Sequence, residues 1–72
     1  MLKVADLLIQ LNEAERLVLG NAVGAGLRNA RLAAQCLTDP DQHSQDVLQL
    51  LAYLTTAVTE LEAARELVRQ RA

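Results

Sequence analysis

Few side chains in this sequence have the chemistry of a catalytic or metal-binding group. The chain holds one cysteine, Cys36, and one histidine, His43. A nucleophilic pair of these two would need a third group to orient the histidine and a glycine-built site for a developing oxyanion, and the sequence offers neither. A lone histidine without a companion at ligand spacing does not make a zinc site. The sequence therefore predicts no enzyme, no cofactor and no metal.

The glycines and the charges also fail to indicate a small-molecule or nucleic-acid site. Gly20, Gly24 and Gly26 lie inside a helical pattern, without the preceding strand or the Lys-Ser/Thr ending of a phosphate loop. The formal charge of −2 provides no basic patch for nucleic acid or for an anionic membrane. Glu62 and Glu66 are expected on a solvated helix face.

Several features favour a cytoplasmic protein. No apolar run is long enough to span a bilayer. The apolar start of the chain is interrupted by Asp6 and is not followed by a small-residue cleavage site, so we expect it to form the first turns of a helix. A single cysteine forms no internal disulfide.

The composition and spacing predict an all-α fold. Leu and Ala supply 27 of the 72 residues, whereas Gly totals three and Pro one, a balance that favours helix. We expect one domain over 1–72, with a first helix over about 3–37, a turn at 38–40 and a second helix over about 40–70. Asp39 and Pro40 are typical of a helix start. Two helices joined by a short turn form an antiparallel hairpin.

The glycine segment predicts a kink in the first helix near Gly20–Gly26, because each Gly costs about 1 kcal/mol relative to Ala within a helix. Two interpretations stay open. A partner backbone approaches closely over these small residues, or neighbouring contacts hold the helix and the glycines are tolerated.

Apolar rows along the helices predict which surfaces pack together. One row of the first helix is expected to face the second helix, and it comprises Val4, Leu8, Leu11, Val18, Ala22, Ala25, Leu32 and Cys36. Its expected counterpart on the second helix follows a heptad: Val47, Leu51, Leu54, Val58, Leu61 and Val68. A second row on the first helix, which ends at Leu37, stays uncovered. We predict that its members bind a partner protein: Leu19, Val23, Leu27, Ala30 and Ala34.

This assignment leaves two questions open. A helical projection does not decide which of the two rows on the first helix faces inward. Glu15 and Asn29 also lie on the apolar side of that helix, where each would act as a buried polar group that fixes register. Alternatively, Glu15 lies at the edge of the packed surface and reaches water or pairs with an arginine of the second helix.

The segment from Leu37 onward resembles the second half of the small type III secretion proteins YscE, PscE, SsaE and EscE. The resemblance is carried at the turn and the start of the second helix by Leu37, Asp39, Pro40, Gln42, Gln45, Leu48, Leu50 and Leu51. The first helix is similar to this family through its VADLLIQL segment and a charged patch of Glu13, Glu15 and Arg16.

The resemblance implies a cytoplasmic co-chaperone that pairs with a tetratricopeptide-like chaperone. Together, the two would hold a needle subunit unpolymerised before export. The alternative prediction is a homodimer, in which two hairpins pair into a four-helix bundle and act as a generic interaction adaptor.

Overall fold

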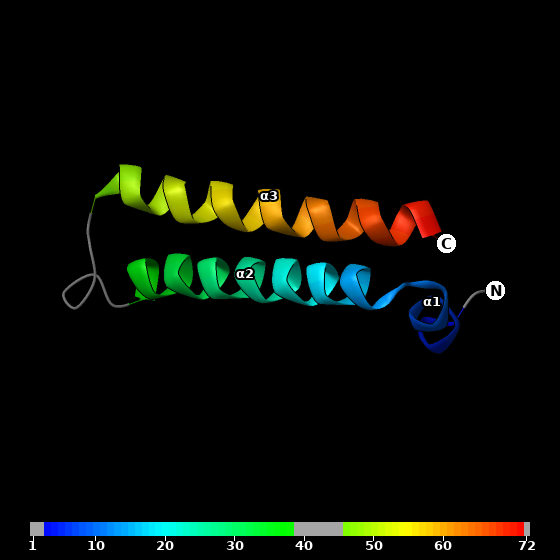
Figure 1. Cartoon of the computed structure of the whole chain (residues 1–72). Coiled ribbons are helices and arrows are strands. Elements are labelled where there is room, and N and C mark those ends of the chain that lie inside the picture. Colours follow the sequence, from blue (N-terminus) through cyan, green and yellow to red (C-terminus); the bar gives the residue numbers. More distant parts are fainter. Residues whose placement is uncertain (1–2, 39–45, 72) are drawn as a thin grey trace.

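The computed structural model describes residues 3–38 and 46–71, and this part of the chain is all helical. Three α-helices follow one another: α1 (Val4–Gln10), α2 (Glu13–Thr38) and α3 (Val47–Arg71). Figure 1 shows α2 and α3 side by side along most of their lengths, with α1 at the end where the two termini lie. The expected all-α class is confirmed. The expected two-helix hairpin is corrected, because three helices are present.

The predicted first helix is divided between Gln10 and Glu13. Leu11 has an extended backbone, with φ −81° and ψ 137°, and its side chain is buried. Asn12 then caps α2 through a reciprocal pair of hydrogen bonds: the Glu15 amide donates to Asn12 Oδ1 at 2.7 Å, and the Asn12 amide donates to Glu15 Oε1 at 3.1 Å. This capping box starts a new helix. An Asn followed three residues later by a Glu is the sequence signal for it.

The glycine segment does not interrupt the helix. α2 runs continuously from Glu13 to Thr38, and none of the three glycines has a positive φ. The break in the first half of the chain therefore lies at 11–12 and not within 20–26. A backbone that stays helical through three glycines must be held by tertiary packing, because the glycines themselves disfavour helix.

The start of α3 lies later than predicted. α3 begins at Val47, and the Asp46 side chain caps it by accepting a hydrogen bond from the Leu48 amide at 2.9 Å. The predicted caps Asp39 and Pro40 lie outside the described residues.

Small side chains form the seam between α2 and α3. The buried residues of α2 are Ala22, Gly26 and Ala33. Those of α3 are Ala57 and Ala64. They recur at steps of four or seven residues, as in a coiled coil. The half-buried members of the same two rows are Glu15, Leu19, Asn29 and Cys36 on α2 and Leu50, Tyr53, Glu60 and Leu67 on α3.

Gly26 is a point of close contact between the two helices. A Cβ atom at this position would lie 2.6 Å from Leu61 Cγ and 3.5 Å from the Ala57 carbonyl oxygen. A Cβ at Gly20 or Gly24 would meet nothing within 4 Å. Of the three glycines, only Gly26 is required by the packing of α2 on α3.

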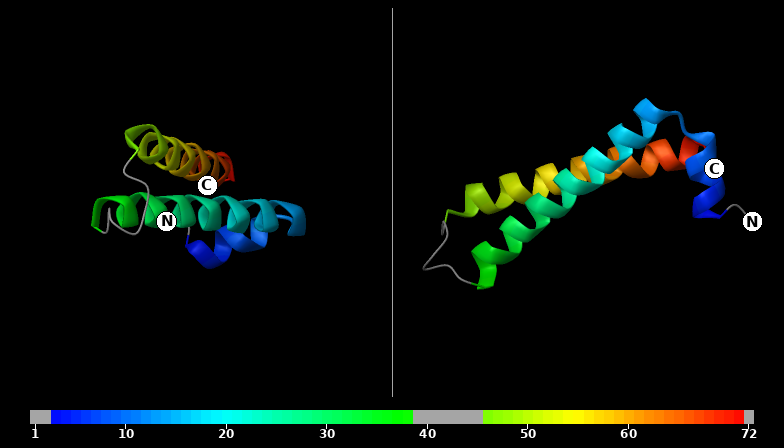
Figure 2. Two further views of the ribbon diagram at one scale, coloured as in Figure 1. Left: turned by 90° about the vertical axis from the view of Figure 1, so that its left-hand side faces the viewer. Right: turned by 60° about the horizontal axis from the view of Figure 1, so that its bottom comes forward.

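The helix α1 packs at the end of the hairpin where α2 begins and α3 ends, which we call the open end. Figure 2 shows α1 turned away from the axis of α2, close to the carboxyl end of α3. Its contacts with the rest of the described chain are mainly with α3. Leu7 is buried in this arrangement, whereas Val4 and Ile9 are exposed. Val4 therefore does not belong to the hairpin seam, contrary to the prediction.

The contrast between the glycines gives a stability prediction. Gly24→Ala is expected to raise the free energy of unfolding by about 0.5 to 1 kcal/mol, because Ala favours helix and the space is open. Gly26→Ala is expected to be less stable than Gly24→Ala by at least about 1 kcal/mol, because its Cβ displaces Leu61. Urea unfolding followed by circular dichroism, at one protein concentration, measures both. Equal stabilities would contradict the close approach at Gly26.

Candidate interaction surface

The two rows that flank the seam lie on opposite sides of the hairpin. In an antiparallel pair, the residue that follows each seam position points to the same side of the hairpin in both helices. On this side, α2 contributes Val23, Leu27, Ala30, Ala34 and Leu37, and α3 contributes Val47, Leu51, Leu54, Val58 and Leu61. We call this set the aliphatic face.

Every member of the aliphatic face is exposed. The exposed fraction of its Leu and Val side chains ranges from 43% at Leu54 to 69% at Leu37. Among the described residues, no large side chain is fully buried. The fully enclosed positions of the hairpin thus hold small side chains, whereas most of its large aliphatic side chains are exposed.

The opposite side of the hairpin is more polar. Its positions precede those of the seam, and they include Asn21, Arg28 and Gln35 on α2 and Gln49, Thr56, Thr59 and Glu66 on α3. This side also carries Val18, Ala25 and Leu32, so it is mixed in character, whereas the aliphatic face is apolar at every position.

The predicted partner-binding residues are divided by the structure. Val23, Leu27, Ala30 and Ala34 lie exposed on the aliphatic face, while Leu19 is half-buried in the seam. Their binding to a partner stays a prediction.

The predicted packing row of the second helix was wrong for most of its members. Val47, Leu51, Leu54 and Val58 lie exposed beside the seam. Leu61 is also partly exposed but contacts α2 at Gly26, and Val68 is half-buried. Ala57 and Ala64 take the inner positions, since small side chains let two helix backbones approach more closely than Leu or Val would. On α2, Ala22 is buried and Ala25, Leu32 and Cys36 are half-buried as predicted, whereas Val18 is exposed.

The total exposed area is large for the mass of the chain. The accessible surface is 5454 Å² for 7.9 kDa. A compact monomer of this mass exposes about 4,400 Å². The excess of about 1,000 Å² is comparable to the roughly 800 Å² that each partner buries in a standard protein interface.

An ion pair joins the two helices at the open end of the hairpin. Arg71 Nε donates to Glu15 Oε2 at 3.0 Å, and Arg71 Nη2 contacts the same oxygen. This pair links residues 56 positions apart and sets α3 beside the start of α2. The expectation that Glu15 pairs with an arginine of the second helix is confirmed. Asn29 instead donates to the Ala25 carbonyl oxygen at 2.9 Å, within its own helix.

The surroundings of Glu15 lower the pKa of its carboxyl group below the ordinary value of 4.5. The largest cause is the hydrogen bond with Asn12, followed by the hydrogen bond and the positive charge of Arg71. Both stabilise the carboxylate form.

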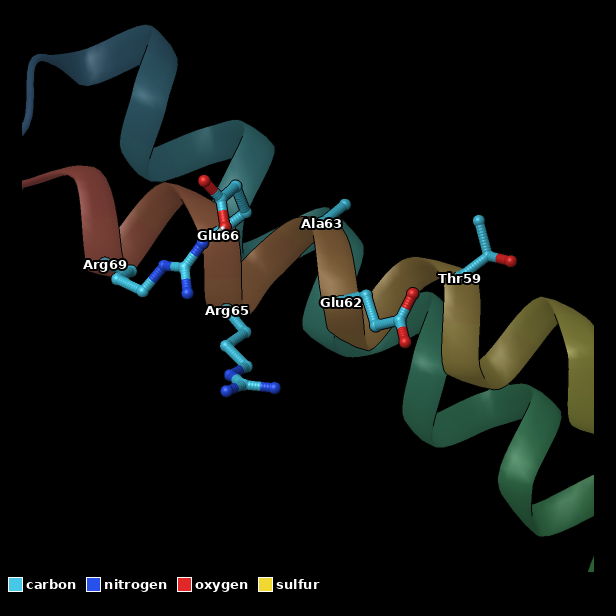
Figure 3. Close-up of a pocket in the computed structure, with 6 residues that line it drawn as sticks. All are labelled: Thr59, Glu62, Ala63, Arg65, Glu66 and Arg69. Carbon is cyan, nitrogen blue, oxygen red and sulfur yellow. Dashed lines mark hydrogen bonds and ion pairs between the residues drawn. The ribbon is translucent and has the colours of Figure 1, made fainter.

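A second surface feature lies on the outer side of α3. Figure 3 shows a shallow hollow along one helix, lined by Thr59, Glu62, Ala63, Arg65, Glu66 and Arg69. Glu66 pairs with Arg69 at 2.8 Å, and both side chains are largely exposed. An exposed pair three residues apart on one helix contributes little and belongs to a solvated surface.

The residues with possible catalytic or metal chemistry are not brought together in the described part of the chain. Cys36 is half-buried in the seam, and His43 lies outside the described residues. Within 3–38 and 46–71, no group of three His, Cys, Asp or Glu side chains is placed to hold a metal ion. No helix among these residues has the length and apolar character to cross a membrane.

Comparison with protein-family models, with curated proteins and with solved structures finds no match to this chain.

The Glu15–Arg71 pair gives a prediction about pH. Because the folded protein lowers the pKa of Glu15, its carboxylate adds stability above the ordinary pKa, and this stability is lost as pH falls through the folded value. Glu15→Gln keeps a capping side chain but removes the charge. At about pH 7 the variant is expected to unfold more easily than the wild type, and at about pH 2 the two are expected to converge.

Chemical unfolding at a series of pH values measures this difference. Arg71→Gln serves as the matched variant, since it removes the ion pair and leaves the Asn12 cap intact. A constant difference between wild type and Glu15→Gln across the acid range would contradict the assigned role of Glu15.

Proposed function

We propose that this chain is a co-chaperone whose aliphatic face binds a tetratricopeptide-like chaperone. In this proposal the pair resides in the cytoplasm and keeps a needle subunit of a type III secretion system unpolymerised before export. The observation that supports it is the aliphatic face itself, a continuous set of exposed Leu, Val and Ala side chains on two helices. Exposed aliphatic surface of this extent is typical of a protein interaction site.

The shape of the face favours a helical partner. Two parallel ridges of aliphatic side chains, one from α2 and one from α3, pack well into the groove between neighbouring helices. Tetratricopeptide repeats stack helix pairs into a concave surface of this kind. The face has no aromatic residue to fill a deep pocket, so contact over a broad area suits it better than a few anchors.

The similarity to the YscE, PscE, SsaE and EscE proteins supports the same partner class. It is carried mainly by residues 37–51, and this stretch includes Leu37, Val47 and Leu51 of the aliphatic face. A chaperone bound here is stabilised by mass action, because binding favours its folded state.

The first prediction on function concerns α2. Val23→Glu and Leu27→Glu are expected to weaken chaperone binding by at least about 3 kcal/mol, because each places an unpaired charge in an apolar interface. Both positions are exposed in the free chain, so the hairpin should stay helical. Leu17→Glu is the matched control, since Leu17 is 65% exposed and lies outside the aliphatic face.

The measurement is co-expression of the tagged chain with the tetratricopeptide-like protein and the needle subunit encoded in the same genome. The wild type and Leu17→Glu should recover a soluble complex, while the two face variants should lose the chaperone and keep their circular dichroism. If the wild type recovers no chaperone, the co-chaperone function is wrong. If Val23→Glu binds as well as the wild type, another surface carries the interaction.

A further inference from the structure

We propose that, in the absence of another partner, a second copy of this chain covers the aliphatic face, so that the free protein is a two-fold symmetric dimer with a four-helix core. This inference goes beyond the proposed function and does not depend on it. It concerns the state of the chain before any chaperone is bound.

The exposed area is what a stable dimer requires. The chain exposes about 1,000 Å² more than a compact monomer of its mass, and a standard interface removes roughly 800 Å² from each partner. Eight of the fourteen large aliphatic side chains that are exposed among the described residues lie together on the aliphatic face, from Val23 to Leu37 on α2 and from Val47 to Leu61 on α3. The other six lie on α1, at the start of α2 and at Leu48.

The charges permit two copies to meet through this face. All members of the aliphatic face are uncharged, so contact between copies buries no pair of like charges. The formal charge of −2 on each chain is small, and repulsion between copies is correspondingly weak. Arg65 follows the α3 row at the open end, outside the apolar part of the face.

The two halves of the face have complementary sizes. The middle of the α2 row is small, with Ala30 and Ala34, whereas the middle of the α3 row is large, with Leu54 and Val58. The Glu15–Arg71 pair and the contact of Gly26 with Leu61 fix the antiparallel register, and this register sets Ala30 within about one helical turn of the level of Leu54.

A two-fold axis along the hairpin brings these complementary halves together. It sets α2 of one copy over α3 of the other. Leu54 and Val58 of each copy then fill the space above the small side chains Ala30 and Ala34 of its neighbour. A two-fold interface of this kind uses the same surface on both copies and closes at two chains.

Sedimentation equilibrium of the purified chain tests the dimer. The wild type and the control Leu17→Glu are expected to have twice the chain mass of 7.9 kDa. Leu54→Glu is expected to raise the dimer dissociation constant at least about a hundredfold, because the charge would be buried between copies. The thermal midpoint of the wild type is expected to rise with protein concentration, as dimer formation requires.

An exchange of side-chain sizes tests the packing of α2 on α3. Ala30→Leu and Leu54→Ala should each weaken the dimer, the first by overfilling the interface and the second by leaving a cavity. The double variant should recover part of the loss, since the large side chain then comes from the other helix.

Three results would overturn the proposal: a wild type of single chain mass, a thermal midpoint independent of concentration, or a Leu54→Glu variant that remains fully dimeric. These outcomes are separate from those of the co-chaperone proposal. A wild type that is dimeric but captures no chaperone supports the homodimer and rejects the co-chaperone. A monomeric wild type that captures the chaperone does the reverse.

Discussion

The close contact of α2 and α3 at Gly26 is the constraint on which the rest of the structure depends. With Ala57 and Leu61 against its Cα, this position admits no side chain without displacement of Leu61. The neighbouring seam positions, Ala22, Ala33 and Ala64, are small for the same reason. The two backbones therefore lie near one another over a long stretch, and α2 remains helical through a glycine-rich segment that would be unstable alone.

A seam of small side chains has a consequence for stability. Each buried Ala removes little more than a methyl group from water, whereas burial of a Leu or Val contributes about 1.5 to 3 kcal/mol. The hairpin leaves much of that larger contribution unused, because most of its Leu and Val side chains are exposed outside the seam. A second chain that covered these side chains, as proposed above, would therefore add to the stability of the fold.

The open end of the hairpin has its own stabilising contacts. Glu15 takes part in the cap of α2 and in the ion pair with Arg71, so one side chain starts a helix and aligns the two helices. The break at 11–12 that makes this cap possible also lets α1 turn and bury Leu7 and Leu11. These contacts lie away from the aliphatic face, which leaves that face free of charge.

The sequence by itself determined the helical class, the antiparallel pairing and the existence of an apolar row beyond the hairpin seam. These follow from composition and from three-to-four-residue periodicity, which are local properties of the chain. It also contained the Asn12 to Glu15 capping signal that divides the first half of the chain. That signal depends on only two residues, whereas the apolar spacing continues on both sides of it. The spacing therefore predicted one continuous helix.

Only the tertiary structure decided which rows face inward. Periodicity ranks Leu51, Leu54 and Val58 above Ala57 and Ala64 as packing residues, because it weighs hydrophobicity and not size. When two helices pair, the distance between their axes limits the size of the side chains between them. Small residues therefore occupy the inner positions when the backbones are close. As a result, the α3 row that pattern alone assigns to the hairpin joins Val23 and Leu27 in one exposed face.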